Sequence, residues 1–121
     1  MSEADSSLTD TDLDNAIAER VMGWYLQEVA PSGVSFWGWV DKAGAVQCNF
    51  ECWQPSTDMN PAMEVIEGLD KERGWRTQMQ YHNKAWCVQI DDGNCNDLAF
   101  RAGDSLPEII CRAALDCIET K

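Results

Sequence analysis

The stretch RTQMQYHNKAWCVQIDDGNCNDLAF, residues 76–100, decides the fold. Two of its segments alternate between polar residues and mostly apolar ones, which is typical of β-strands with one buried face. The turn-forming pairs Asn83 and Lys84, and Asp92 and Gly93, separate the strands. The residues expected on the buried face are Thr77, Met79, Tyr81, Trp86, Val88, Ile90, Leu98 and Phe100. The stretch therefore predicts a three-stranded antiparallel meander with one face in the core.

The opposite face of this meander is polar and mostly uncharged. If helices covered both faces, these side chains would need buried hydrogen-bond partners. The face is therefore either partly open or in contact with another subunit or a ligand, and the chain is compatible with a homodimer. The residues that we expect to bind a partner or ligand there are Arg76, Gln78, Gln80, Gln89 and Arg101, with His82 at the strand end.

Three segments show the spacing of helices that bury one side. The first begins at Thr9 or Thr11, and the second begins near Met59 and ends at Gly74. The third begins at Ser105, which forms a capping box with Glu108. The expected buried stripes are Leu13, Ala16, Ile17, Val21 and Trp24 in the first helix, Met59, Ala62, Met63, Ile66 and Leu69 in the second, and Leu106, Ile110, Ala113, Ala114 and Cys117 in the third.

Two further strands are expected between the first two helices. Residues 34–40 and 46–52 predict a β-hairpin with its turn at residues 41–44. The order of elements is then α-ββ-α-βββ-α. We therefore expect an α+β fold, in which a mostly antiparallel sheet of about five strands packs with three helices as a layered α/β sandwich. Residues 1–8 predict a flexible acidic tail, and residues 9–121 a single domain.

The net charge limits the partners that the chain can bind. Its 121 residues include 21 acidic and 9 basic side chains, a formal net charge of −12. Such a charge repels nucleic acids and anionic membranes, and it speeds encounter with basic proteins. The sequence has no run of the roughly 18 apolar residues that a membrane helix needs, and its start lacks a signal-peptide pattern. We expect a cytoplasmic protein with reduced cysteines, a partner protein with a basic surface, and no direct contact with nucleic acid or membrane.

The six cysteines and the single histidine do not form a recognised reactive site. Cys48 and Cys52 lie in a predicted strand, which would separate their Cα atoms by about 13 Å. Thiolates that share a zinc ion must each lie ~2.3 Å from it. No cysteine lies in a known nucleophile motif, and the glycines do not form a phosphate-binding loop. We therefore predict no metal, no cofactor and no enzymatic activity.

Acidic residues crowd the outer side of the second predicted helix. Residues three or four positions apart on a helix are neighbours, so these carboxylates can form a continuous ridge. Such a ridge suits a surface lined by arginine, although a solvated helix side has the same composition. The candidate partner-binding residues of this acidic ridge are Glu64, Glu67, Asp70 and Glu72.

Three phrases of the sequence resemble the phage ABA sandwich domain proteins. They are LDNAIAERVMGW (residues 13–24), WQPSTDMNPAMEVIEGLDKERGW (residues 53–75) and AFRAGDSLPEIICRAAL (residues 99–115), in the same order along nearly the whole chain. The resemblance implies helices layered on a sheet, an origin in a phage or prophage, and a place of action in the bacterial host cytoplasm. It implies no activity and assigns no ligand-binding residue.

These features lead to one main hypothesis and two alternatives. The main hypothesis is a phage-encoded acidic binding protein that inhibits or modulates a host or defence protein, such as a nucleic-acid-handling or antiviral complex, by surface contact. The first alternative is an oligomeric protein that holds a small nucleotide-like signal between Trp37, Trp39 or Trp53 and Arg76 or Arg101. The second alternative is a phage assembly component.

Overall fold

The computed structural model describes residues 10–30, 32–94 and 96–119. The predicted acidic tail at residues 1–8 and the predicted helix start at Thr9 lie outside the described residues, as does Cys95. The helices are α2 (Asp10–Ala16), the π-helical turn η1 (Ile17–Val21) that continues it, the 3-10 turn η2 (Phe50–Cys52), α3 (Met59–Arg73) and α4 (Leu106–Glu119). The strands are β1 (Tyr25–Val29), β2 (Phe36–Val40), β3 (Val46–Asn49), β4 (Arg76–His82), β5 (Ala85–Asp91) and β6 (Asp97–Gly103).

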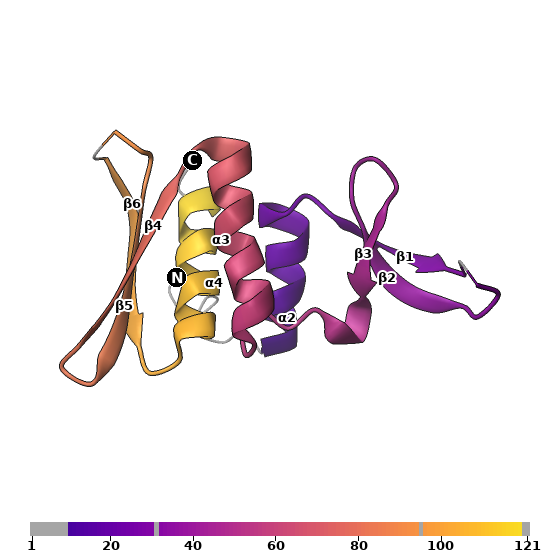
Figure 1. Ribbon diagram of the computed structural model, residues 1–121, viewed down its shortest axis with the longest axis horizontal. Coiled ribbons are helices and arrows are strands. Elements are labelled where there is room, and N and C mark those ends of the chain that lie inside the picture. Colours follow the sequence, from indigo (N-terminus) through magenta and orange to yellow (C-terminus); the bar gives the residue numbers. More distant parts are fainter. Residues whose placement is uncertain (1–9, 31, 95, 120–121) are drawn as a thin grey trace.

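Helices α2, α3 and α4 form a central layer between two separate antiparallel sheets (Figure 1). Sheet A has the strand order β1-β2-β3, and sheet B has the order β4-β5-β6. The prediction of an α+β fold with three helices is confirmed. The prediction of one sheet with about five strands is wrong, because the helical layer separates the strands into two sheets of three.

The strand that the sequence reasoning missed is β1. It follows the first helix after a turn at Gly23, whose φ of +75° lies in the left-handed region that favours glycine. Helical spacing predicted that Trp24 continues the buried stripe of that helix. The helical turn instead ends at Val21, and the Trp24 ring packs against the Trp53 ring with centroids 4.7 Å apart. Because exposed Tyr25 and Leu26 are adjacent, β1 lacks the alternation that reveals a half-buried strand.

Strand β3 is shorter than the sequence predicts. Alternation suggested a strand as far as Cys52, but the strand ends at Asn49, whose side chain accepts a hydrogen bond from the Glu51 backbone N–H at 2.9 Å. This local bond starts the turn η2. The extended geometry assumed for the pair Cys48 and Cys52 therefore does not apply.

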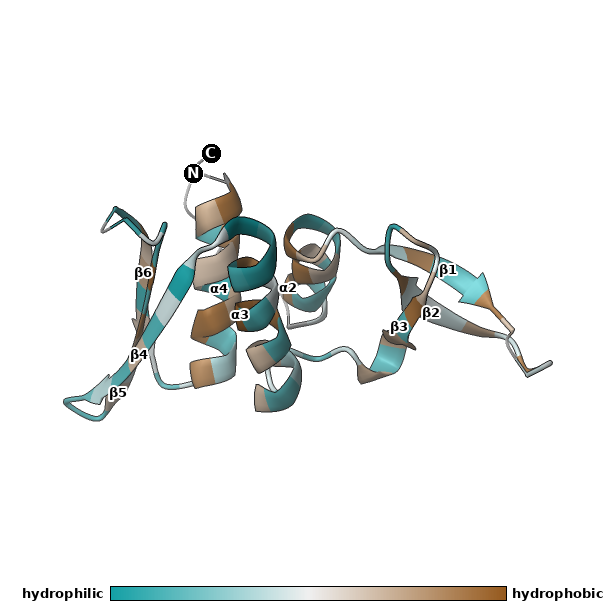
Figure 2. Ribbon diagram, turned by 45° about the horizontal axis from the view of Figure 1, so that its top comes forward, coloured by the Kyte–Doolittle hydropathy of each residue, from teal (hydrophilic) through white to brown (hydrophobic). Residues whose placement is uncertain are grey.

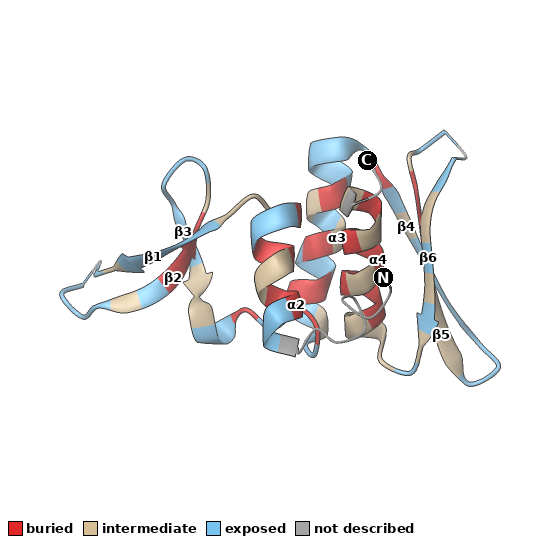
Figure 3. Cartoon of the chain, turned by 180° about the vertical axis from the view of Figure 1, so that it is seen from behind, coloured by how far each residue is buried: buried red, intermediate tan, exposed pale blue. Residues whose placement is uncertain are grey.

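The core lies in the helical layer and on one face of sheet B. Figure 3 shows the buried residues concentrated where the three helices face one another, and Figure 2 shows that α4 is mostly hydrophobic. On α4, Ile110, Ala113, Ala114 and Cys117 are fully buried, as predicted. On α3, Val65 is buried in the stripe, whereas the predicted Met63 is 39% exposed.

The ends of α3 explain why its bounds were predictable. Asp58 caps the start by accepting a hydrogen bond from the Asn60 backbone N–H at 3.0 Å. Gly74 ends the helix with a φ of +70°, and its N–H donates to the Asp70 carbonyl at 2.8 Å. Helix α3 therefore lies fixed at both ends against the core. Among the described residues, no helix is long and apolar enough to span a membrane.

The position of the core predicts that replacing a buried and an exposed apolar side chain by alanine lowers the free energy of unfolding by different amounts. Ile110 is fully buried on α4, so Ile110→Ala should lower the free energy of unfolding by about 3 kcal/mol, through lost burial and the cavity left behind. Phe100 is 63% exposed on sheet B, so Phe100→Ala should lower it by less than about 1 kcal/mol. Urea unfolding followed by circular dichroism measures both. Equal losses would contradict the assignment of Ile110 to the core and of Phe100 to the exposed face of sheet B.

Candidate functional site

Gln78, Gln80 and Phe100 are exposed on the face of sheet B that points away from the helices. The register places Gln89 between Gln78 and Phe100, and it places Cys87 between Gln80 and Ala102. Helix α4 lies on the other face of the sheet (Figure 1), and the described part of the chain leaves Gln78, Gln80 and Phe100 exposed. The sheet therefore presents amides and one aromatic ring to its surroundings.

Arg101 does not belong to this open face, which corrects the sequence prediction. It pairs in register with Val88, which is fully buried against the helices, so Arg101 also points toward α4. Its Nε lies 2.6 Å from Asp116 Oδ2 and its Nη2 lies 2.9 Å from Asp116 Oδ1. The same register turns Phe100 outward, so the prediction that Phe100 continues the buried face is also wrong. The paired guanidinium holds β6 to α4.

Arg76 lies at the start of β4 and is also paired. Its Nε donates to Asp91 Oδ1 at 3.1 Å, and this carboxylate also accepts from the Gly93 backbone N–H at 2.8 Å. The Arg76 side chain is 55% exposed, whereas that of Asp91 is 5% exposed. Arg76 and Arg101, the two arginines that we expected to bind a ligand, thus pair with the carboxylates of Asp91 and Asp116. The structure does not bring them together with the predicted stacking residues. Trp37 and Trp39 lie in sheet A, on the other side of the helical layer, and Trp39 and Trp53 are buried.

Three of the four predicted acidic-ridge residues lie on one wall of a cleft. The cleft has a volume of about 560 Å³ and separates α3 from the end of η1 and from the turn between β2 and β3. Glu64, Glu67 and Glu72 line it, together with Gly68 and Lys71 of the same helix. The fourth ridge residue, Asp70, does not line this cleft. The predicted acidic ridge therefore corresponds to one wall of the cleft, except that Asp70 lies outside it.

The opposite wall could not be predicted from local patterns, because it comes from segments distant along the chain. It consists of Val21, Met22, Trp24, Asp41, Lys42, Ala43 and Gln47. The Asp41 carboxylate orders its turn by accepting hydrogen bonds from the Ala43 and Ala45 N–H groups, each at 2.9 Å. It also accepts one from Gln47 Nε2 at 2.8 Å. The turn is thus held in a fixed conformation beside α3.

The cleft is narrow at Gly68, which lies close to Met22 of the opposite wall. A Cβ atom built on Gly68 would lie 3.3 Å from both Cε and Sδ of Met22, so the absence of a side chain lets the two walls approach. Glu64, Glu67 and Glu72 have no hydrogen-bond or ion-pair partner among the described residues. Their carboxylates are available for a bound group.

A second hollow of about 300 Å³ adjoins one end of the cleft. The two share Val21, Met22, Lys42 and Glu72, and the second adds Arg20 and Arg73. The Arg73 guanidinium lies 5.1 Å from the centroid of the Trp75 ring. The combined groove is therefore acidic at Glu64 and Glu67 and basic toward Arg20 and Arg73.

The thiols lie in two different environments. Cys111 and Cys117 are buried in the core, and burial raises the pKa of Cys111, with the Asp14 carboxylate acting in the same direction. Partial burial, the charge of Glu64 and the nearby Cys52 raise the pKa of Cys48 from its ordinary value of 9.0 to about 11. Within the described ranges, no three His, Cys, Asp or Glu residues are grouped so that they could hold a metal ion. His82 is exposed at the end of β4.

The sequence profile of the Phage ABA sandwich domain matches residues 15–115, so the chain belongs to this family. The fold is similar to that of a phage protein from Bacillus cereus ATCC 14579, for which a crystal structure at 2.0 Å exists. The superposition covers 92% of this chain and 93% of that chain, with a TM-score of 0.57 and 15% sequence identity. This likeness concerns the fold alone. No protein with a curated description matches the sequence.

The environment of Cys48 predicts slow alkylation. At pH 8 a thiol with a pKa of about 11 has a thiolate fraction roughly 100-fold lower than one with the ordinary value of 9.0. Glu64→Gln removes a charge that disfavours the thiolate, so iodoacetamide should then label Cys48 faster, as peptide mass spectrometry can measure. Glu67→Gln, one turn along α3, is the matched control. Equal acceleration by both variants would contradict the position of Glu64 beside β3.

Proposed function

We propose that this member of the Phage ABA sandwich domain family is a phage- or prophage-encoded binding protein of the bacterial host cytoplasm. It engages a basic surface on a host or defence protein, and it inhibits or modulates that protein by contact. The observation that carries this proposal is the cleft beside α3, where the carboxylates of Glu64, Glu67 and Glu72 share the lining with Met22 and Trp24 in a chain of net charge −12. The role that we propose requires binding and no reaction.

The chemistry of the cleft suits the side chain of an arginine or lysine from the partner. The aliphatic part of such a side chain can lie against Met22 and Trp24, since long cationic side chains pack their stems on apolar surface. Its charged end then reaches Glu64 and Glu67, which strengthen the hydrogen bonds because both groups are ionised. A guanidinium can in addition stack on the Trp24 ring.

The basic end of the groove adds selectivity to the contact. Lys42 and Lys71 line the cleft, and Arg20 and Arg73 line the adjoining hollow. A partner segment with only positive charges meets repulsion there, whereas a segment that carries a carboxylate next to its basic residue meets attraction at both ends. Unfavourable charge pairs of this kind distinguish correct partners from incorrect ones. We therefore expect a mixed-charge segment and not a uniformly basic one.

The nucleotide-sequestering alternative has less support. Its two candidate phosphate ligands, Arg76 and Arg101, pair with Asp91 and Asp116. Of its three candidate stacking residues, Trp37 is exposed, while Trp39 and Trp53 are buried. A rise in melting temperature with a nucleotide at the open face of sheet B would favour this alternative over our proposal.

The proposal predicts which substitutions abolish partner capture. The tagged protein should retain a host protein from a bacterial lysate at low salt, and the triple variant Glu64→Gln, Glu67→Gln, Glu72→Gln should reduce its recovery by about tenfold or more. Recovery should also decrease as the salt concentration increases from about 50 to about 300 mM, because the higher concentration screens the attraction between surface charges more strongly. Quantitative mass spectrometry of the retained proteins measures both effects.

Asp70→Asn is the matched control for this experiment. It removes one negative charge from the same helix at an exposed position that does not line the cleft. Recovery of the partner should remain within about twofold of the original. If the triple variant retains the same proteins as the original chain, or if Asp70→Asn abolishes capture, the cleft is not the binding surface.

A further inference from the structure

The hollow of about 300 Å³ next to the cleft gathers basic side chains in a strongly acidic protein. Arg20 comes from the end of η1, Lys42 from the turn between β2 and β3, and Arg73 from the end of α3. The whole chain has only 9 basic residues against 21 acidic ones. Among the described residues, Glu72 is the one acidic side chain that lines this basic hollow. The lining therefore carries more positive than negative groups, opposite to the chain as a whole.

Two of these cations have no carboxylate partner. The ion pairs found in the described ranges join Arg76, Arg101 and Arg112 to carboxylates of the fold. Lys42 and Arg73 form no ion pair with any residue of those ranges. Because both side chains line the same hollow, their charges are available together for an anion from outside the chain.

The side chains of Lys42 and Arg73 are nevertheless held in position. A Cβ atom built on Gly23 would lie 3.2 Å from Lys42 Cε and 3.9 Å from its Nζ, so the lysine stem lies directly over this glycine. Hydrogen bonds to the Asp41 carboxylate fix the turn that carries Lys42. The Arg73 guanidinium lies 5.1 Å from the centroid of the Trp75 ring, as in a cation–π contact. Donors that are already positioned lower the entropic cost of binding.

The helix dipoles do not account for this cluster. Basic side chains in the last turn of a helix interact favourably with its carbonyl end, and Arg20 and Arg73 occupy such positions in η1 and α3. However, the last carbonyls of α3 already accept hydrogen bonds from the N–H groups of Gly74 and Trp75, at 2.8 and 3.3 Å. Lys42 belongs to neither helix, since its turn is part of sheet A. Its place in the hollow needs another explanation.

We propose that the basic hollow binds a phosphate group. Donors reach the hollow from three segments, and a tetrahedral group with three terminal oxygens can accept hydrogen bonds from all three directions, whereas one guanidinium matches a planar carboxylate. A phosphate dianion has a charge of about −2, which Lys42 and Arg73 together balance. A carboxylate meets attraction there too, but it carries half this charge. The phosphate belongs either to a small molecule or to a phosphorylated side chain of the partner protein.

Titration of the ¹⁵N-labelled chain with inorganic phosphate, at constant ionic strength, tests the site. Saturable shifts should appear at the Gly23 amide and at the Arg73 Nε–H. Lys42→Gln and Arg73→Gln should each raise the Kd for phosphate by about tenfold, because each removes a hydrogen bond between two charged groups. Glu72→Gln should lower this Kd, because it removes the carboxylate that repels the anion.

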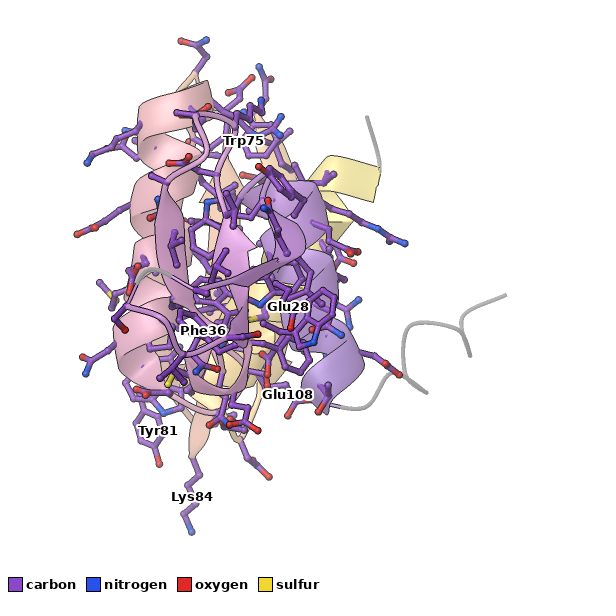
Figure 4. All side chains as sticks on the ribbon, turned by 90° about the vertical axis from the view of Figure 1, so that its right-hand side faces the viewer. Glu28, Phe36, Trp75, Tyr81, Lys84 and Glu108 are labelled. Atoms are coloured by element: carbon purple, nitrogen blue, oxygen red, sulfur yellow. The ribbon has the colours of Figure 1, made fainter. Side chains whose placement is uncertain are left out.

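Lys71→Gln and Lys84→Gln are the matched controls. Lys71 lies on the same helix as Arg73 and lines the cleft but not the basic hollow. Lys84 lies at the tip of the β4–β5 hairpin, and Figure 4 shows it at the opposite end of the molecule from Trp75. Each control removes one positive charge, and the Kd for phosphate should stay within about twofold of the original. Circular dichroism confirms that each variant is folded.

Two further ligands identify the source of the phosphate group. Phenyl phosphate represents a small molecule, and a peptide with one phosphoserine next to one arginine represents a partner protein. If the partner supplies the phosphate, the peptide should bind at least about tenfold more tightly than phenyl phosphate, because its arginine also reaches the cleft. The double variant Glu64→Gln, Glu67→Gln should then remove this gain. Equal Kd values for the two ligands indicate a small molecule.

The site itself does not rest on the proposed function, because phosphate is titrated into the chain alone. The phosphate site would be overturned by shifts that do not saturate, by acetate that binds as tightly as phosphate, or by a Kd that neither Lys42→Gln nor Arg73→Gln changes. Each of these results would leave the cleft proposal standing. Conversely, failure to capture a host protein would overturn the proposed function and leave the phosphate site standing.

Discussion

The burial of α4 is the constraint on which the rest of the structure depends. Ile110, Cys111, Ala113, Ala114 and Cys117 are all fully buried, so this helix contacts other elements over most of its circumference. Small side chains at Ala113 and Ala114 allow neighbouring elements to approach closely, and close approach increases the dispersion attraction between them. Because α4 contacts η1, α2, α3 and sheet B, loss of its packing would release both the helical layer and the sheet.

Placing the helices at the centre determines what each sheet leaves exposed. Sheet B covers α4 with Val88 and Ile90 and turns Gln78 and Phe100 outward. Sheet A contributes Trp39 to the core, and several of its other large apolar residues remain exposed. The acidic side chains of α3 lie between these two ends and form one wall of the cleft. The protein thus has a polar sheet face and a charged cleft on separate parts of its surface.

The parts of the fold that could be predicted are those governed by local signals. Helix α3 has a capping aspartate and a terminal glycine, and β4 and β5 alternate regularly around a short turn. Strand β1 lacked such a signal, because its exposed Tyr25 and Leu26 are adjacent. Local reasoning also could not predict which side chains of β6 face the core. Leu98 and Phe100 suggest that they share the buried face, whereas the register turns Arg101 toward α4, where it pairs with Asp116. The pairing of Arg101 on β6 with Asp116 on α4 thus goes with the orientation of that strand, and local sequence does not reveal it.

The candidate cleft shows the same division between local and long-range information. Helical spacing identified Glu64 and Glu67 as neighbours, whereas Trp24 and Lys42 reach the cleft only through the packing of η1 and the turn of sheet A against α3. The most direct test of the cleft is a titration of the ¹⁵N-labelled chain with a short peptide that contains one arginine and one aspartate. Saturable shifts at the Gly68 and Ala43 amides and at the Trp24 indole N–H would support binding there. Shifts confined to sheet B, or spread evenly over all acidic segments, would contradict it.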